Sequence, residues 1–258
     1  MTLTDHLQPL LDKRLPATIV AGMLFVASAR AENHLVPEVS SYMPLATFQS
    51  GYMTLDMKVF AEAFSDDVKA RVVVEPSFSH EFAVGVREAA GKYYLIYFEA
   101  PEQIWKYVVL EEMKKGDVTV TQGGKSTTAD EIAKLEKSLP PDVATIKLDK
   151  HELEIGRDLA EALLEDWREL LLQTHYDRDV DFGLDGDFYH FSMTVDRQDL
   201  AGRVWSPPRD TDIGRLVEIV YAIRDICSGK KGTSLNDIRS QALDLNSRLQ
   251  TGATGVKK

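Results

Sequence analysis

The stretch that decides the fold is residues 70–98, ARVVVEPSFSHEFAVGVREAAGKYYLIYF. Residues 70–75 are a β-branched run that ends at a proline, residues 80–87 alternate with Phe82, Val84 and Val86 on one face, and residues 92–98 are apolar on both faces. Alternation at period two is typical of a half-buried strand, and an apolar run on both faces is typical of a central strand. The link EAAG, residues 88–91, fits a hairpin turn. The stretch therefore predicts neighbouring strands joined by hairpins.

Amphipathic helices and further short strands are predicted around this stretch. Helical spacing of apolar residues predicts helices at 54–64 (with Thr54 as N-cap), from Pro101, at 128–139, 149–175, 210–227 and 234–249. Further strands are predicted at 117–122, 143–148, 188–195 and 201–206. Because the strands cluster in hairpins and do not alternate regularly with helices, we predict an α+β fold with a mostly antiparallel sheet packed with several amphipathic helices.

The N-terminus has the three parts of a secretory signal peptide. Basic Lys13-Arg14 precede the uncharged residues 15–28, and Ala29-Arg30-Ala31 follow as a cleavage site. The apolar run is shorter than the roughly 20 residues that span a bilayer, so we expect no transmembrane helix in the mature chain. We predict a periplasmic or secreted protein. The alternative is a cytoplasmic protein that keeps this segment as a buried helix.

The domain organisation follows from these boundaries. Residues 1–31 are the predicted cleavable signal peptide, and residues 32–250 form a single predicted α+β domain with a possible sub-boundary near 140–142, where prolines stop a helix. Residues 251–258 lack an apolar pattern and are predicted to be a disordered tail.

Composition limits the classes of function. The 258 residues are 44% hydrophobic and 28% charged, which is typical of a globular protein. The chain has 30 Lys and Arg against 41 Asp and Glu, a net charge of −11, so we predict no nucleic-acid partner. The lone Cys227 lies at helical spacing with apolar residues and is predicted to be a buried thiol.

An acidic stretch provides the one candidate metal site. Asp177, Asp179 and Asp181 alternate, so several carboxylate oxygens can turn toward one hard cation such as calcium. The stretch lacks the glycine and glutamate of an EF-hand loop, and a solvated turn is the alternative. No other cofactor is predicted.

A candidate binding patch involves one tryptophan. Trp205 ends a predicted strand before Ser206, and we expect it to be half exposed. With Asp185 and Tyr189 it would line a patch for a partner or a ligand. The alternative is that Trp205 covers the core.

The sequence has no nucleophile elbow and no zinc-ligand spacing. We therefore predict an exported binding or interaction protein for an unknown protein or small ligand, without a recognisable catalytic centre. One alternative is an exported hydrolase whose carboxylates or histidines are assembled by the fold. The other is a cytosolic protein of unknown role, if the N-terminus is retained. The sequence leaves the oligomeric state open.

Overall fold

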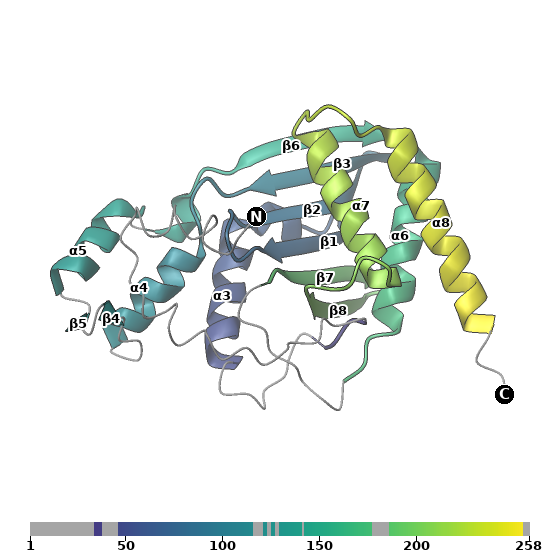
Figure 1. Ribbon diagram of the computed structural model, residues 1–258. Helices are drawn as coiled ribbons and strands as arrows, with labels where there is room; N and C mark the ends of the chain where they lie inside the picture. The colour runs from purple at the N-terminus through teal and green to yellow at the C-terminus, as the bar shows by residue number, and fades with distance from the viewer. Residues whose placement is uncertain are drawn as a thin grey trace.

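A six-stranded antiparallel sheet forms the centre of the protein (Figure 1). The computed structural model describes residues 34–37, 46–115, 121–122, 125–126, 129–140, 142–176 and 186–254. The sheet has the order β6-β3-β2-β1-β7-β8, and each neighbouring pair is antiparallel. Its strands are β1 (Val68–Glu75), β2 (Phe82–Ala89), β3 (Lys92–Glu99), β6 (Asp149–Ile155), β7 (Phe188–Val195) and β8 (Gln198–Trp205), and β4 (Thr121–Gln122) and β5 (Lys125–Ser126) form a separate pair. The predicted α+β class with an antiparallel sheet is confirmed.

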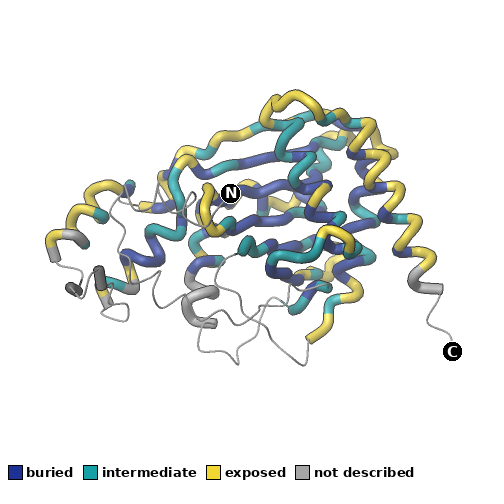
Figure 2. Tube along the Cα trace, viewed as in Figure 1, coloured by how far each residue is buried: buried dark blue, intermediate teal, exposed yellow. Residues whose placement is uncertain are grey.

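Helices pack on both faces of this sheet. The first face carries α6 (Arg157–Leu172), α7 (Asp212–Cys227) and α8 (Leu235–Thr254). The second face carries α3 (Ala46–Val59), the 3-10 turn η1 (Ala61–Phe64), α4 (Trp105–Lys115) and the 3-10 turn η2 (Val143–Thr145). Helix α5 (Ala129–Ser138) packs against α4, away from the sheet (Figure 1). Figure 2 shows the result, with the middle of β1 to β3 buried and the outer side of α8 exposed. The sheet is therefore the middle layer of three.

The apolar runs found in the sequence explain why the inner strands lie between two helical layers. Val72 and Val74 of β1 belong to the core under α6 and α7, whereas Val73 belongs to the core on the opposite face. All three are fully buried. A strand that is apolar on both faces is stable only when both faces are covered.

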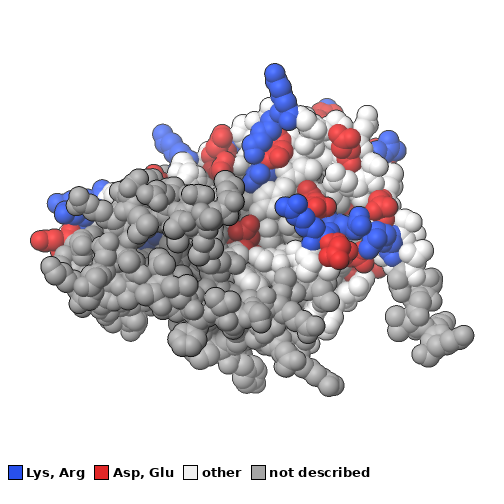
Figure 3. All heavy atoms as spheres, viewed as in Figure 1, with Lys and Arg blue, Asp and Glu red and all other residues white. Residues whose placement is uncertain are grey.

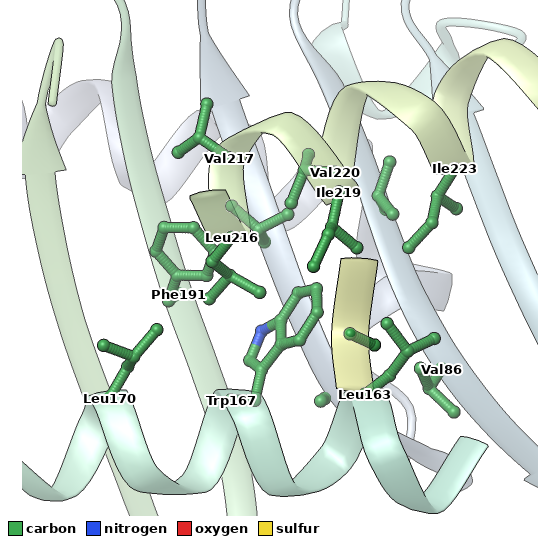
Figure 4. Close-up of a cluster of buried hydrophobic side chains, with 14 of the residues drawn as sticks. Val86, Leu163, Trp167, Leu170, Phe191, Leu216, Val217, Ile219, Val220 and Ile223 are labelled. Atoms are coloured by element: carbon green, nitrogen blue, oxygen red, sulfur yellow. The ribbon is translucent and has the colours of Figure 1, made fainter. Parts of the chain in front are cut away.

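Trp167 of α6 is the largest side chain at the centre of the first core (Figure 4). Its ring lies edge-on to Phe191 with the ring centroids 5.8 Å apart, and its Nε1 donates a hydrogen bond to the backbone oxygen of Arg71 at 3.3 Å. Figure 4 shows the labelled residues of α6 and α7 pointing toward one another over the strands. The tryptophan thus joins a helix to two strands.

The prediction of one helix from Asp149 to His175 is wrong in its first third. Residues 149–155 form strand β6, paired with β3, and α6 begins only at Arg157. The side chains of residues 149–155 alternate between the two faces of a strand. Glu152 and Glu154 lie on one face, where they form ion pairs with Arg87 of β2 (2.6 Å) and Lys92 of β3 (2.9 Å).

Smaller differences concern element ends. Residues 143–145 form a 3-10 turn, not the predicted strand, because the Asp142 side chain accepts a hydrogen bond from the amide of Ala144 at 2.9 Å and caps the turn. Thr54 lies inside α3 and does not cap it. Helix α8 continues to Thr254.

Two predictions about chain organisation concern residues 1–31 and residues 140–142. The signal-like segment 1–31 lies outside the described residues. Strands from both sides of residues 140–142 join the same sheet. Within the described ranges, no helix is both long enough and apolar enough to cross a membrane.

Asp166 is an unusual feature of the first core. It lies on the buried side of α6, and neither of its carboxyl oxygens has a hydrogen-bond partner in the described chain. Burial raises its pKa to about 8, and the nearby charge of Glu165 adds to the effect. The folded protein therefore holds Asp166 protonated at neutral pH.

Replacing Asp166 by Asn should flatten part of the pH dependence of stability. Because the folded pKa is raised, the wild-type contribution is fully present below about pH 4 and is lost as the pH rises toward about 8. We expect Asp166→Asn to increase the free energy of unfolding by about 5 kcal/mol at pH 8 and to change it little at pH 4. Urea unfolding at both pH values measures this. An equal change at both values would contradict it, and Glu161→Gln, at an exposed site on the same helix, is the control.

Candidate functional site

Five polar side chains are buried together between α3 and the second face of the sheet. We call them the acid network: Tyr52, Asp56, Glu75, Glu81 and His190. Their exposed fractions are 8%, 0%, 7%, 1% and 6% respectively. Tyr52 and Asp56 are one helical turn apart on α3, whereas the others come from β1, β7 and the loop before β2. Buried polar groups in such number require mutual satisfaction.

Glu81 connects α3 to the start of α4. Its carboxylate accepts hydrogen bonds from the Tyr52 hydroxyl and from the amides of Ile104 (2.9 Å) and Trp105 (3.0 Å). The partial positive charge of a helix N-terminus also favours a carboxylate at this place. Burial nevertheless raises the pKa of Glu81, since desolvation outweighs these hydrogen bonds. Glu81 is thus held in position by three donors and by burial.

Asp56 and Glu75 form a pair of carboxyl groups next to a histidine. Glu75 Oε1 lies 3.2 Å from His190 Nε2. Neither oxygen of Asp56 has a hydrogen-bond partner in the described chain. Burial and the charge of Glu75 raise the pKa of Asp56 well above its usual range, and the opposing effect of His190 is smaller. Asp56 therefore holds a proton, because ionising a fully buried carboxyl beside a second one is too costly.

A second polar cluster lies on the first face of the sheet. The Asp187 carboxylate accepts hydrogen bonds from the hydroxyls of Tyr221 (3.0 Å) and Tyr189 (3.3 Å), which are 3.1 Å from each other. Arg224 stacks on the ring of Tyr221 at 4.6 Å. Burial raises the pKa of Tyr221 to about 12 and that of Tyr189 further. Both hydroxyls therefore remain protonated donors at neutral pH.

The β1–β2 loop, residues 76–81, lies at the same end of the sheet as both clusters. Ser77 donates its amide to Asp187 Oδ1 at 3.2 Å, and its hydroxyl accepts from the amide of Gly186 at 2.9 Å. Two residues further along the loop, the backbone oxygen of Ser79 accepts a hydrogen bond from Gln103 Nε2 at 3.3 Å. Between these anchors, the Phe78 side chain is 57% exposed. The loop is thus fixed on each side of an exposed aromatic ring.

The structure separates the side chains predicted to form a binding patch. Tyr189 pairs with Val204 and Trp205 with Phe188 in the β7–β8 register, so Tyr189 and Trp205 face opposite sides of the sheet. Trp205 is only 7% exposed, and the expectation that it is half exposed is wrong. The backbone of Gly186 lies against its indole ring, which leaves no room for a Cβ.

The other predicted residues lie outside the described residues. These are Asp185 of the patch and the calcium candidates Asp177, Asp179 and Asp181. Calcium binding by this stretch stays a prediction. Within the described part of the chain, no group of three or more His, Cys, Asp or Glu side chains is arranged to hold a metal ion. Cys227 is partly buried, and burial raises the pKa of its thiol to about 12.

Sequence reasoning missed the acid network, although one signal was present. Asp56 lies at helical spacing with Tyr52, Val59 and Phe60, all of which are buried. A carboxylate on the apolar stripe of a helix is expected to be paired. The sequence does not identify Glu75 as the neighbour of Asp56, because the two residues meet only when α3 packs on the sheet.

Comparison with known proteins does not assign a function. A scan against protein-family models and searches of curated proteins and solved structures found no match to the chain. The functional argument therefore rests on the geometry of these clusters and of the loop.

Removing the Glu81 carboxylate should be strongly destabilising. Glu81→Ala leaves a buried hydroxyl and two buried amides without their acceptor, so we expect a loss of about 3–5 kcal/mol in the free energy of unfolding. Tyr52→Phe removes one of these hydrogen bonds and should cost about 1–2 kcal/mol. Urea unfolding checks both values. Glu102→Ala, which removes a partly exposed ion pair with Lys106, is the control and should cost under about 0.5 kcal/mol. Similar losses for Glu81→Ala and Glu102→Ala would contradict the proposed role of Glu81.

Proposed function

We propose that the protein is an exported binding or interaction protein that contacts its partner through the β1–β2 loop. The observation that carries the proposal is Phe78, a 57% exposed aromatic side chain on a loop held at Ser77 and Ser79. Aromatic side chains on pre-organised backbone are common anchors of protein interfaces, since little conformational entropy is lost on binding. The position of the anchored ring supports recognition rather than chemistry.

The surrounding surface supports a protein or small-molecule partner over nucleic acid. Figure 3 shows Lys, Arg, Asp and Glu side chains next to one another over α7 and α8. The interleaving includes the pairs Arg215–Asp244 at 3.4 Å and Arg248–Asp212 at 2.9 Å. Neutralising phosphates requires uncompensated cations, and these arginines are compensated.

The acid network supports a second candidate, an exported hydrolase. Buried carboxyls next to a histidine, with a raised pKa such as that of Asp56, occur at catalytic sites. Asp56 is fully buried, however, so a substrate would reach it only after α3 moved. Turnover on a panel of hydrolase substrates, abolished by Asp56→Asn in a folded variant, would favour the hydrolase over the binding protein.

Photo-crosslinking in the producing cells tests the binding proposal. A photoreactive phenylalanine analogue at position 78 should give a discrete adduct with one partner, because the ring points to solvent from a fixed loop. The same analogue at Leu243, which is 52% exposed on α8, is the matched control and should not give that adduct. Identical adducts at both positions, or none at position 78, would count against the proposal.

Phe78→Ala supplies the complementary test. Because the side chain is exposed, we expect the free energy of unfolding to change by less than about 0.5 kcal/mol. Purified wild-type protein added in excess should compete for the partner and reduce the amount of adduct formed at position 78. The Phe78→Ala protein should not reduce it. Equal competition by both proteins would show that Phe78 is not the anchor.

The export part of the proposal rests on the N-terminal pattern. Cleavage after Ala31 would give a mature chain that begins at Glu32. We expect intact-mass analysis of fractionated cells to find that chain outside the cytosol. A chain that retains residues 1–31 in the cytosol would remove export from the proposal and leave the loop contact to be tested among cytosolic partners.

A further inference from the structure

We propose that the acid network is a proton-controlled latch: α3 docks on the sheet while the buried, unpartnered carboxyl of Asp56 holds a proton, and it releases when that proton is lost. The latch does not rest on the binding proposal, because it concerns the docking of α3 and not a partner at Phe78, although Glu81 at the end of the β1–β2 loop belongs to the network. Its ligand is the proton itself.

The first argument is that the acid network includes most of the buried side chains in the part of α3 whose side chains the structure describes. From Tyr52 to Val59, the buried residues are Tyr52, Asp56 and Val59, and Leu55 packs partly buried against the apolar core. Tyr52 and Asp56 both belong to the acid network. Over residues 52–59, polar contacts thus supply much of the attachment of α3, so their free energy affects whether this part of the helix stays docked.

The second argument is that Asp56 requires the proton. The side chain is 0% exposed, and neither oxygen receives a hydrogen bond from a backbone amide or a cationic side chain in the described chain. A carboxylate in that position would be desolvated and uncompensated, which costs several kcal/mol. A proton on Asp56 removes that cost, and burial accordingly raises its pKa.

The third argument is the charge of the groups that face Asp56. Glu75 on β1 and Glu81 in the loop before β2 are acidic, and both raise the pKa of Asp56. His190 on β7 opposes them, and Arg203 is its cross-strand neighbour on β8. The amides at the start of α4 are directed at Glu81. Loss of the proton therefore adds a third negative charge to a site whose donors are already engaged.

Arg71 and Tyr52 complete the set of titratable groups on the facing elements. Arg71 lies on the same face of β1 as Glu75, but its guanidinium stacks over the ring of Phe64, 4.6 Å from the ring centroid. Tyr52 donates to Glu81, and burial together with nearby carboxylates raises its pKa. Neither group supplies a cation to Asp56.

The direction of the pH dependence follows. The pKa of Asp56 is raised in the docked state, so docking is most stable below the ordinary carboxyl value of about 4 and weakens as the pH rises toward the docked value. The raised pKa of Glu81 acts in the same direction. The latch is closed in acid and opens in alkali.

Hydrogen exchange of the α3 amides, read by mass spectrometry, tests the latch on the full chain. Rates are compared at about pH 6 and about pH 9 after correction for intrinsic exchange. We expect the protection of residues 52–59 to fall at least about tenfold at the higher pH, while peptides of β2 and β3 keep theirs. Asp56→Asn cannot lose a proton and should keep α3 equally protected at both values. Asp66→Asn, at an exposed site nearby, is the matched control and should behave like wild type.

Each other outcome would overturn the latch. Protection of α3 that is independent of pH in the wild type would show that no proton controls docking. A tenfold loss that persists in Asp56→Asn would assign control to another group. Loss of protection in β2 and β3 together with α3 would indicate global unfolding. Glu75→Gln provides a second variant in case Asp56→Asn folds poorly, and it should weaken the pH dependence because Asp56 then faces a neutral donor.

Discussion

Burial of the central strand on both faces is the constraint on which the rest of the structure depends. Val72, Val73 and Val74 are fully buried, and consecutive side chains of a strand point to opposite faces. Each face must therefore be covered by helices, which α6 to α8 do on one side and α3 and α4 on the other. The two coverings differ in kind. The first is built around Trp167 and buries the single carboxyl of Asp166, whereas the second contains the five side chains of the acid network.

The difference between the layers explains where polar chemistry accumulates. Asp187, Glu75 and Glu81 all lie at the same end of the sheet, where β1 ends and where β2 and β7 begin. Backbone groups at strand ends lose their ladder partners, so side chains and helix termini replace them. Glu81 does this for α4, and Asp187 does it for Ser77. Those contacts hold the β1–β2 loop in place.

Local patterns predicted the sheet well and the site poorly, for a physical reason. The alternation with period two over residues 80–87 and the apolar run at 92–98 identified β2 and β3. This was possible because the side-chain pattern within a single strand reflects which of its two faces are buried. Residues 149–155 were assigned to a helix because a capping-like sequence resembled a helix start, whereas cross-strand ion pairs to Arg87 and Lys92 decide the outcome. The acid network joins residues from position 52 to position 190 and has no local pattern. Only the anomalous position of Asp56 on an apolar stripe was readable.

The strand order has a consequence for synthesis on the ribosome. β1 pairs on one side with β2, which follows it directly, and on the other with β7, which begins at Phe188. Until that segment has emerged, the nascent β1–β2–β3 unit has an open edge lined by Val72 to Val74. An apolar open edge readily pairs with other chains. The nascent chain thus exposes this edge during the whole interval between the synthesis of β1 and that of β7.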